Sequence, residues 1–349
     1  MIGPEGRLRL TLVLMLLLAP AHAAAEILLP PGFTAQVYVT GEGYQAAGAQ
    51  GLRGIPATST LAFDDAGFLY LARNGRRYFS GQVEDLWPIY RIPPGGARLT
   101  PDTEARYFHG PPLWNAQVAT IRAGREVFLT TFDRERKTGV LYRLLNGRAE
   151  FFAGGTPQDG TPPLLRQPEG AAVDVAGNVY VADRLQGVVI RLDPFGRVLD
   201  PRYVAVSRPR VLAVDGEGQL WVASDGFAEA PWGGGPGAIW RVGPDGMPRL
   251  VLYGPMAGGM SVAHGSHLFV GDRQAGEIFA IDPAGNRTQF ARFTFGDAPR
   301  TLGFAPVTPE TRRLGIAGDL FVVTIARGAW PVNEILRISG PFEEFLRNR

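Results

Sequence analysis

The chain has 349 residues, no cysteine and a formal net charge of only +2. The absence of cysteine excludes disulfides, thiolate metal sites and a cysteine-linked lipid anchor. The basic residues are almost all arginine and are scattered with no basic stripe, so we expect no nucleic-acid partner.

The first 23 residues have the pattern of a cleavable secretion signal. Arg7 and Arg9 precede the apolar run over 10–18, and Ala21-His22-Ala23 has the small residues of a cleavage site. The run is shorter than the roughly 20 apolar residues needed to span a bilayer. We therefore expect a signal peptide over 1–23, a single mature domain over 24–349 without a membrane span, and a periplasmic or secreted location.

A repeated unit of short strands occupies most of the remaining chain. Its clearest copy, over 167–196, has a small-residue strand, an Asp-x-x-Gly turn, a Val/Tyr strand and a third alternating strand. Period-two alternation bounded by Gly, Pro and Asp is typical of β-strands. In chain order, the six copies begin with paired strands over 59–73, 117–131, 167–183, 208–224, 260–272 and 300–325.

These units resemble the NHL repeat, most specifically over 167–183. The preceding linker Ala153-Gly-Gly-Thr-Pro-Gln-Asp-Gly160 is also similar to the connection between blades in that family. The resemblance implies an all-β, six-bladed β-propeller of four-stranded blades, in which radial repetition protects the strand edges. The strand over 33–39 has no partner near the first repeat, so we expect it to supply the outer strand of the last blade and close the ring.

Position in the repeat predicts which residues share one end of the ring. A blade zigzags, so the start of its innermost strand and the end of its second strand lie together, while the Asp-containing turns lie at the opposite end. The starts of the inner strands carry Ser59, Gln117, Glu169, Arg210, Gly259 and Arg300. The loops at the same end carry Trp87, Trp114, Trp232 and Trp330.

We expect a ligand site at this end, lined by Gln117, Glu169, Arg210 and Arg300 and rimmed by the four loop tryptophans. Arginines beside a carboxylate, surrounded by amphipathic aromatics, suit a small ligand, and the planar fork of arginine suits a carboxylate or phosphate. The expected ligand is therefore anionic or sugar-like, or else the tryptophan-bearing face meets a protein. A structural ion pair between Glu169 and Arg210 is the alternative.

Two resemblances imply catalysis instead. The architecture is similar to the senescence-marker and gluconolactonase propellers, which implies a calcium ion at Glu169 with Asp183 and Asp272, although both aspartates could simply accept loop N–H groups. Leu29-Pro-Pro-Gly-Phe33 resembles the start of quinone-dependent sugar and sorbosone dehydrogenases, which implies pyrroloquinoline quinone, calcium and a catalytic histidine. His109 is the only histidine expected near the right face.

The sequence favours an exported NHL-type propeller that acts as a ligand-binding or protein-interaction module. The alternative is a propeller enzyme acting on a sugar or lactone, either as a calcium-dependent hydrolase or as a quinone-dependent dehydrogenase. Whether the protein is catalytic stays open at this point.

Overall fold

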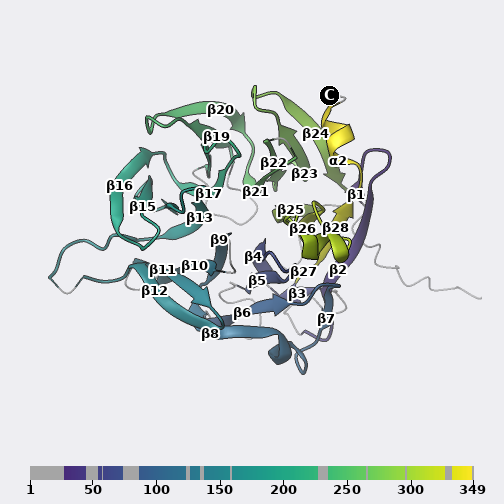
Figure 1. The fold of residues 1–349 in the computed structure, drawn as a ribbon, viewed down its shortest axis with the longest axis horizontal. Helices are drawn as coiled ribbons and strands as arrows, with labels where there is room; N and C mark the ends of the chain where they lie inside the picture. Colours follow the sequence, from purple (N-terminus) through teal and green to yellow (C-terminus); the bar gives the residue numbers. More distant parts are fainter. Residues whose placement is uncertain are drawn as a thin grey trace, which may run out of the picture.

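The strands form six four-stranded antiparallel blades around a central axis, which confirms the propeller expected from the repeats (Figure 1). The computed structural model describes residues 27–44, 54–56, 58–73, 86–122, 126–133, 137–157, 159–226, 235–264, 266–294, 297–326 and 332–347. The expected signal peptide over 1–23, Trp232 and Trp330 lie outside these residues.

Blades 1 to 5 run in chain order from an inner to an outer strand. Blade 1 contains β4 (Thr58–Phe63), β5 (Leu69–Arg73), β6 (Leu86–Ile92) and β8 (Phe108–Trp114). Blade 2 contains β9 (Gln117–Arg122), β10 (Glu126–Asp133), β11 (Thr138–Leu145) and β12 (Arg148–Gly154). Blade 3 contains β13 (Pro168–Val173), β14 (Val179–Asp183), β15 (Val188–Leu192) and β16 (Val198–Ala205).

The next two blades repeat this order. Blade 4 contains β17 (Pro209–Val214), β18 (Leu220–Ser224), β19 (Gly237–Val242) and β20 (Pro248–Gly254). Blade 5 contains β21 (Ala257–Ala263), β22 (His267–Asp272), β23 (Glu277–Ile281) and β24 (Arg287–Phe293), and β1 (Ile27–Leu28) pairs with its outer edge.

Blade 6 combines strands from the two ends of the chain and so closes the ring. It contains β25 (Asp297–Phe304), β26 (Leu320–Ala326), β28 (Ile335–Ser339) and, as its outer strand, β2 (Thr34–Gly41). The expected closure by the N-terminal strand is therefore confirmed. The seam has two further links, because β7 (Ala97–Leu99) pairs parallel with β2, and β3 (Ile55–Pro56) pairs with β27 (Val332–Asn333).

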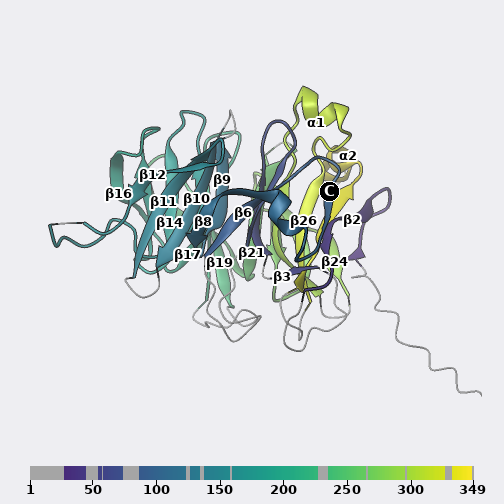
Figure 2. The ribbon, with the colours of Figure 1, turned by 90° about the horizontal axis from the view of Figure 1, so that it is seen from below.

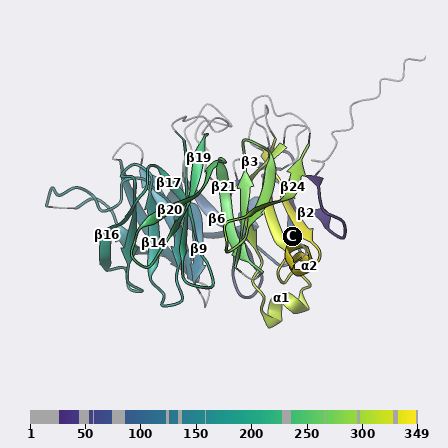
Figure 3. The same cartoon turned by 90° about the horizontal axis from the view of Figure 1, so that it is seen from above.

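Helices are few. The short η1 (Glu104–Tyr107) lies in the connection before β8, and α2 (Phe342–Arg347) follows the last strand. The helix α1 (Pro309–Arg313) lies in the lengthened inner turn of blade 6 and projects from one end of the ring (Figures 2 and 3). Within the described ranges, no helix is long and apolar enough to cross a membrane.

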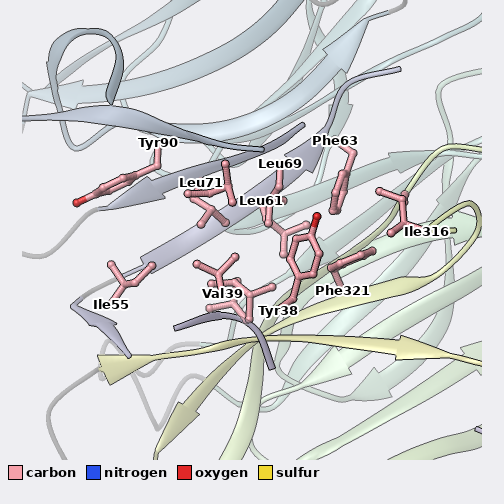
Figure 4. Packing of buried hydrophobic residues seen from close by; sticks show 14 of the residues in the cluster. Tyr38, Val39, Ile55, Leu61, Phe63, Leu69, Leu71, Tyr90, Ile316 and Phe321 are labelled. Atoms are coloured by element: carbon pink, nitrogen blue, oxygen red, sulfur yellow. The ribbon is translucent and has the colours of Figure 1, made fainter. Parts of the chain in front are cut away.

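Apolar side chains fill the spaces between neighbouring blades. Between blades 6 and 1, Tyr38 and Phe321 face Leu61, Phe63 and Leu71 (Figure 4). All five residues of β5, β14 and β18 are buried, because a second strand is covered on both faces by adjacent blades. Each fully buried side chain of this size contributes about 1.5–3 kcal/mol, so the stacked blades provide the core.

The Asp-x-x-Gly turns stabilise the end of the ring opposite the expected site. In blade 4, Asp215 Oδ1 accepts the N–H groups of Glu217 and Gln219, while its Oδ2 accepts the indole N–H of Trp221 at 2.9 Å. Arg241, opposite Trp221 in register, lies over the indole ring. Blades 1 and 3 repeat this aspartate–aromatic–arginine arrangement, which gives several of the scattered arginines a structural role.

Candidate functional site

The inner strands of five blades have a register shift near their first residues. The residues within these shifts are Ser59, Glu169 with Gly170, Arg210, Gly258 and Arg300. A β-bulge takes a side chain out of the regular alternation and re-aims it. These positions share one end of the ring, which we call the channel mouth. In blade 5 the shifted residue is Gly258, one position before the Gly259 expected from the sequence.

The ends of the second strands lie at the same mouth. Pro168 is paired with Asp183, Pro209 with Ser224 and Ala257 with Asp272. The chain continues in these three blades with Arg184, Asp225 and Arg273. The mouth therefore receives charged residues from two positions of the repeat, the start of the inner strand and the residue after the second strand.

Asp225 lies between two arginines from adjacent blades. Its Oδ2 is 3.2 Å from Nη1 of Arg210 and 3.3 Å from Nε of Arg184. The Asp225 side chain is only 5% exposed, whereas Arg210 keeps 27% of its surface accessible although its strand is innermost. Burial opposes the charge on Arg210, but Asp225 and Glu169 outweigh burial and raise the pKa of Arg210 above its ordinary value.

Arg273 completes this charged group from the end of β22. It is buried, and the charged groups acting on it are Arg210, Arg300, Asp225 and Glu169. Burial lowers the pKa of Arg273 well below its ordinary value, and the two neighbouring arginines lower it further. Because a guanidinium stays protonated in proteins, the lowered pKa represents a free-energy cost of keeping this charge, and a bound anion would reduce that cost.

Glu169 lies near Arg210 and Arg273, but its direct hydrogen-bond donors are neutral side chains. Its carboxylate accepts hydrogen bonds from the amide of Gln117 at 2.7 Å and from the amide of Gln167 at 2.9 Å. Its hydrogen-bond partners are thus amides, and Arg210 forms its ion pair with Asp225 rather than with Glu169. The mouth consequently has a cationic arc over blades 3 to 6 and a hydrogen-bonding arc over blades 2 and 3.

The two remaining aspartates of the expected metal set bond to loops. Asp183 accepts the N–H groups of Gln167 and Gln186, and Asp272 accepts those of Gln274 and Ala275. Each aspartate therefore binds main-chain N–H groups of the loops next to the strand that it ends. In the part of the chain that the structure describes, no group of three or more His, Asp or Glu side chains could hold a metal ion.

The two described loop tryptophans lie in blade 1, away from the axis. Trp87 is at the start of the third strand, where its ring covers the guanidinium of Arg73 at 3.7 Å. Arg73 also pairs with Glu104, which accepts the hydroxyl groups of Tyr44 and Tyr90. Trp114 ends the outer strand and is 48% exposed. Trp87 thus packs on Arg73, the arginine that ends the second strand of blade 1.

His109 does not lie near the mouth. It is the second residue of β8, and its ring packs edge-on against Tyr70 at 5.7 Å. Tyr70 donates to Asp64, the aspartate of the inner turn, so His109 is at the opposite end of the blade. The expectation that His109 lies near the right face is wrong, because the connection before it ends earlier than the sequence indicated and the outer strand already starts at Phe108.

Three residues of the mouth were not identified from the sequence: Gln167, Arg184 and Arg273. A signal for the two arginines does exist, because Asp-Arg ends the second strand both at 183–184 and at 272–273. The repeated aspartate anchors the loop, and the residue after it is free of that task. Its side chain is therefore available to the mouth.

Comparisons with known proteins agree with the fold. No protein-family model and no curated protein sequence matches the chain. A solved structure provisionally named a gluconolactonase has a TM-score of 0.55 at 15% identity and covers 90% of this chain and 94% of its own. The quinone-bound aldose sugar dehydrogenase of Streptomyces coelicolor has a TM-score of 0.52 at 15% identity, over 89% and 100% of the two chains.

A binding protein is similar to the same degree. The auxiliary nutrient binding protein of Bacteroides ovatus has a TM-score of 0.56 at 10% identity and covers 89% of this chain and 77% of its own. At these identities the similarity extends to the propeller fold alone. Enzymes and binding proteins share this fold, so function has to be argued from the mouth.

Proposed function

We propose that the protein is an exported propeller that binds a small anionic ligand at the channel mouth. The observation that carries the proposal is the convergence of arginines from four consecutive blades: Arg184, Arg210, Arg273 and Arg300. Two carboxylates, Asp225 and Glu169, lie among them. Arginine forks bind carboxylate and phosphate groups through paired, charge-assisted hydrogen bonds.

The hydrogen-bonding arc of the mouth supports a ligand that also carries hydroxyl groups. Gln117 and Gln167 direct their N–H groups to Glu169, so their amide oxygens remain as acceptors. These two amide oxygens can accept hydrogen bonds from the hydroxyl groups of a ligand. A second anionic group at this place would be repelled by Glu169. An anion with a sugar-like body therefore suits both arcs, and a protein presenting an acidic side chain is the other partner of matching chemistry.

The enzyme alternatives fit the mouth unequally. Calcium fits poorly, because the arginines would repel a cation and because Asp183 and Asp272 bond to loop N–H groups. Pyrroloquinoline quinone fits better, since its carboxylates could be held by the same arginines. His109, the one candidate base, lies at the opposite end of the blade. We therefore place binding first and quinone-dependent dehydrogenation second.

A thermal-shift screen of the mature protein tests the proposal. Citrate, inorganic phosphate, gluconate, pyrroloquinoline quinone, calcium and EDTA are added separately at equal ionic strength. A ligand present at 100 times its Kd stabilises the folded protein by about 2.7 kcal/mol, and we expect the anions to raise Tm. A shift with calcium, lost in EDTA, or with the quinone alone would favour the enzyme alternatives.

Variants identify the site of any shift. Arg210→Ala should remove most of the anion-induced shift, while Arg249→Ala, which makes the same charge change at an exposed position of the outer strand of blade 4, should not. Glu169→Gln should change the preference among anions. If Arg210→Ala and Glu169→Gln leave every response unchanged, the ligand does not bind at the mouth.

A further inference from the structure

Blade 5 differs from its neighbours at the shifted position of the inner strand. Blades 3, 4 and 6 place Glu169, Arg210 and Arg300 there, whereas blade 5 has Gly258. A Cβ atom at Gly258 would overlap the carbonyl oxygen of Arg300 and would lie 2.8 and 2.9 Å from Cγ and Cδ of Arg273. The stem of Arg273 therefore occupies the space that a side chain at this position would need.

With glycine at this position, the positive charge of blade 5 comes from its second strand instead of its inner strand. Arg273 comes from the end of β22, and its main-chain N–H donates to Met256 just before β21. With its backbone fixed there, its side chain crosses Gly258 toward Arg210 and Arg300. Three consecutive blades, 4 to 6, thus each direct one guanidinium to the mouth.

We infer that Gly258 is a positioning residue that admits Arg273 as a third anion-binding arm, and that this arm adapts the mouth to an oxyanion with three or more acceptor oxygens. The inference rests on the proposed anion-binding function and names the class of head group. The four arginines of the mouth outnumber its two carboxylates by two charges, so a single monocarboxylate leaves the mouth with a net positive charge. A phosphate or a polycarboxylate supplies both more negative charge and more acceptor oxygens.

The electrostatics of Arg273 point the same way. An arginine that is buried beside two others stabilises the fold less than an isolated surface arginine does, and a residue kept at such a cost is typical of a binding site. Removing its charge should therefore not lower the stability of the ligand-free protein. The direction of this change in stability distinguishes a ligand-binding arginine from one that stabilises the contact between blades.

The experiment measures binding by calorimetry and thermal shift, with citrate and inorganic phosphate as probes and acetate as the monocarboxylate comparator. The variants are Arg273→Gln, Gly258→Ala and the control Gly216→Ala, whose added Cβ would meet only Ser266 Oγ at 3.3 Å. We expect the natural protein to bind citrate or phosphate about 10-fold more tightly than acetate, the value of one charge-assisted hydrogen bond or more. Arg273→Gln should lose this preference with an unchanged or higher ligand-free Tm.

Gly258→Ala should lose the preference as well, and Gly216→Ala should keep it. Because Gly258→Ala disturbs backbone contacts, its readout is the shift induced by the anion and not its ligand-free Tm. The inference is overturned if Arg273→Gln keeps the preference, if its ligand-free Tm falls while the anion shift persists, or if acetate binds as tightly as citrate. In each of these cases the proposed function stands as long as anions bind and Arg210→Ala abolishes that binding; if no anion binds the natural protein, the proposed function itself fails.

Discussion

Replacement of Asp225 by asparagine should change stability and anion affinity in opposite directions. The Asp225 carboxylate is the shared partner of Arg184 and Arg210, and only 5% of its surface is exposed. Asparagine has nearly the same shape but no charge. The two arginines would then face Arg273 and Arg300 with less opposing charge, which destabilises the ligand-free fold and attracts an anion more strongly.

The two effects have different sizes. Removal of one partner of a buried ion pair costs about 3–5 kcal/mol, and the partial exposure of both arginines reduces this to about 2 kcal/mol. For a domain of about 320 residues that is a decrease of about 3 °C in Tm. A unit charge about 7 Å from a bound anion contributes about 2 kcal/mol at an effective dielectric constant near 20. Allowing for screening by salt, the affinity should increase about tenfold.

The assay combines urea unfolding with titration of citrate or phosphate at two salt concentrations. Asp245→Asn is the control, because it removes the same charge from an exposed turn, where Asp245 accepts the N–H of Met247. A variant Asp225→Asn that loses stability and also binds the anion more weakly would refute the reasoning. Such a result would mean that Asp225 orders the arginines and that their order matters more than their charge.

Three further predictions concern the scaffold. Trp221→Phe leaves the buried carboxylate of Asp215 without its indole donor and should cost about 1–3 kcal/mol in urea unfolding. Phe33→Ala removes a ring that packs edge-on against three phenylalanines where the N-terminal strand closes the ring, and should cost about 3–5 kcal/mol, with no change in the m-value. Burial, and next Arg91, lower the pKa of His109 below 6.5, so the unfolded state binds the proton first and stability should fall as the pH drops through 6.5. His109→Gln should flatten this decrease in the free energy of unfolding below pH 6.5, measured by urea unfolding over a series of pH values.

The sequence was sufficient to predict the fold because the same pattern of strands and turns recurs along the chain. An aspartate at a turn, such as Asp174 or Asp215, accepts the N–H groups that the turn leaves unpaired, and a Val/Tyr strand returns from it. Six copies of a weak pattern at regular spacing identify a propeller much better than a single copy would. The closure by the strand over 33–39 followed from the same count, because that strand had no other place in a ring.

The site was only partly predictable, since its geometry depends on single-residue register shifts. A shift of one position moves a side chain to the other face of a strand, and no sequence pattern fixes where a bulge falls. For this reason Gly259 is expected from the sequence where Gly258 lies. The repeated Asp-Arg at 183–184 and 272–273 points to Arg273 as a mouth residue, but not to the passage of its side chain across Gly258. His109 was misplaced for a related reason, because the start of an outer strand after an irregular connection is poorly defined by periodicity.

The internal symmetry of the ring gives an independent reason to locate function at the mouth. Residues that the propeller needs for folding recur at equivalent positions, as the turn aspartates Asp64, Asp174 and Asp215 do, each with a donor from the next strand. At the start of the inner strand the blades instead differ in size, charge and polarity: Ser59, Gln117, Glu169, Arg210, Gly258 and Arg300. Five residue types occupy these six positions, so the fold does not require any one of them. The proposed off-axis ligand, with an anionic end and a hydroxylated end, would account for this asymmetry, because such a ligand itself lacks the symmetry of the ring.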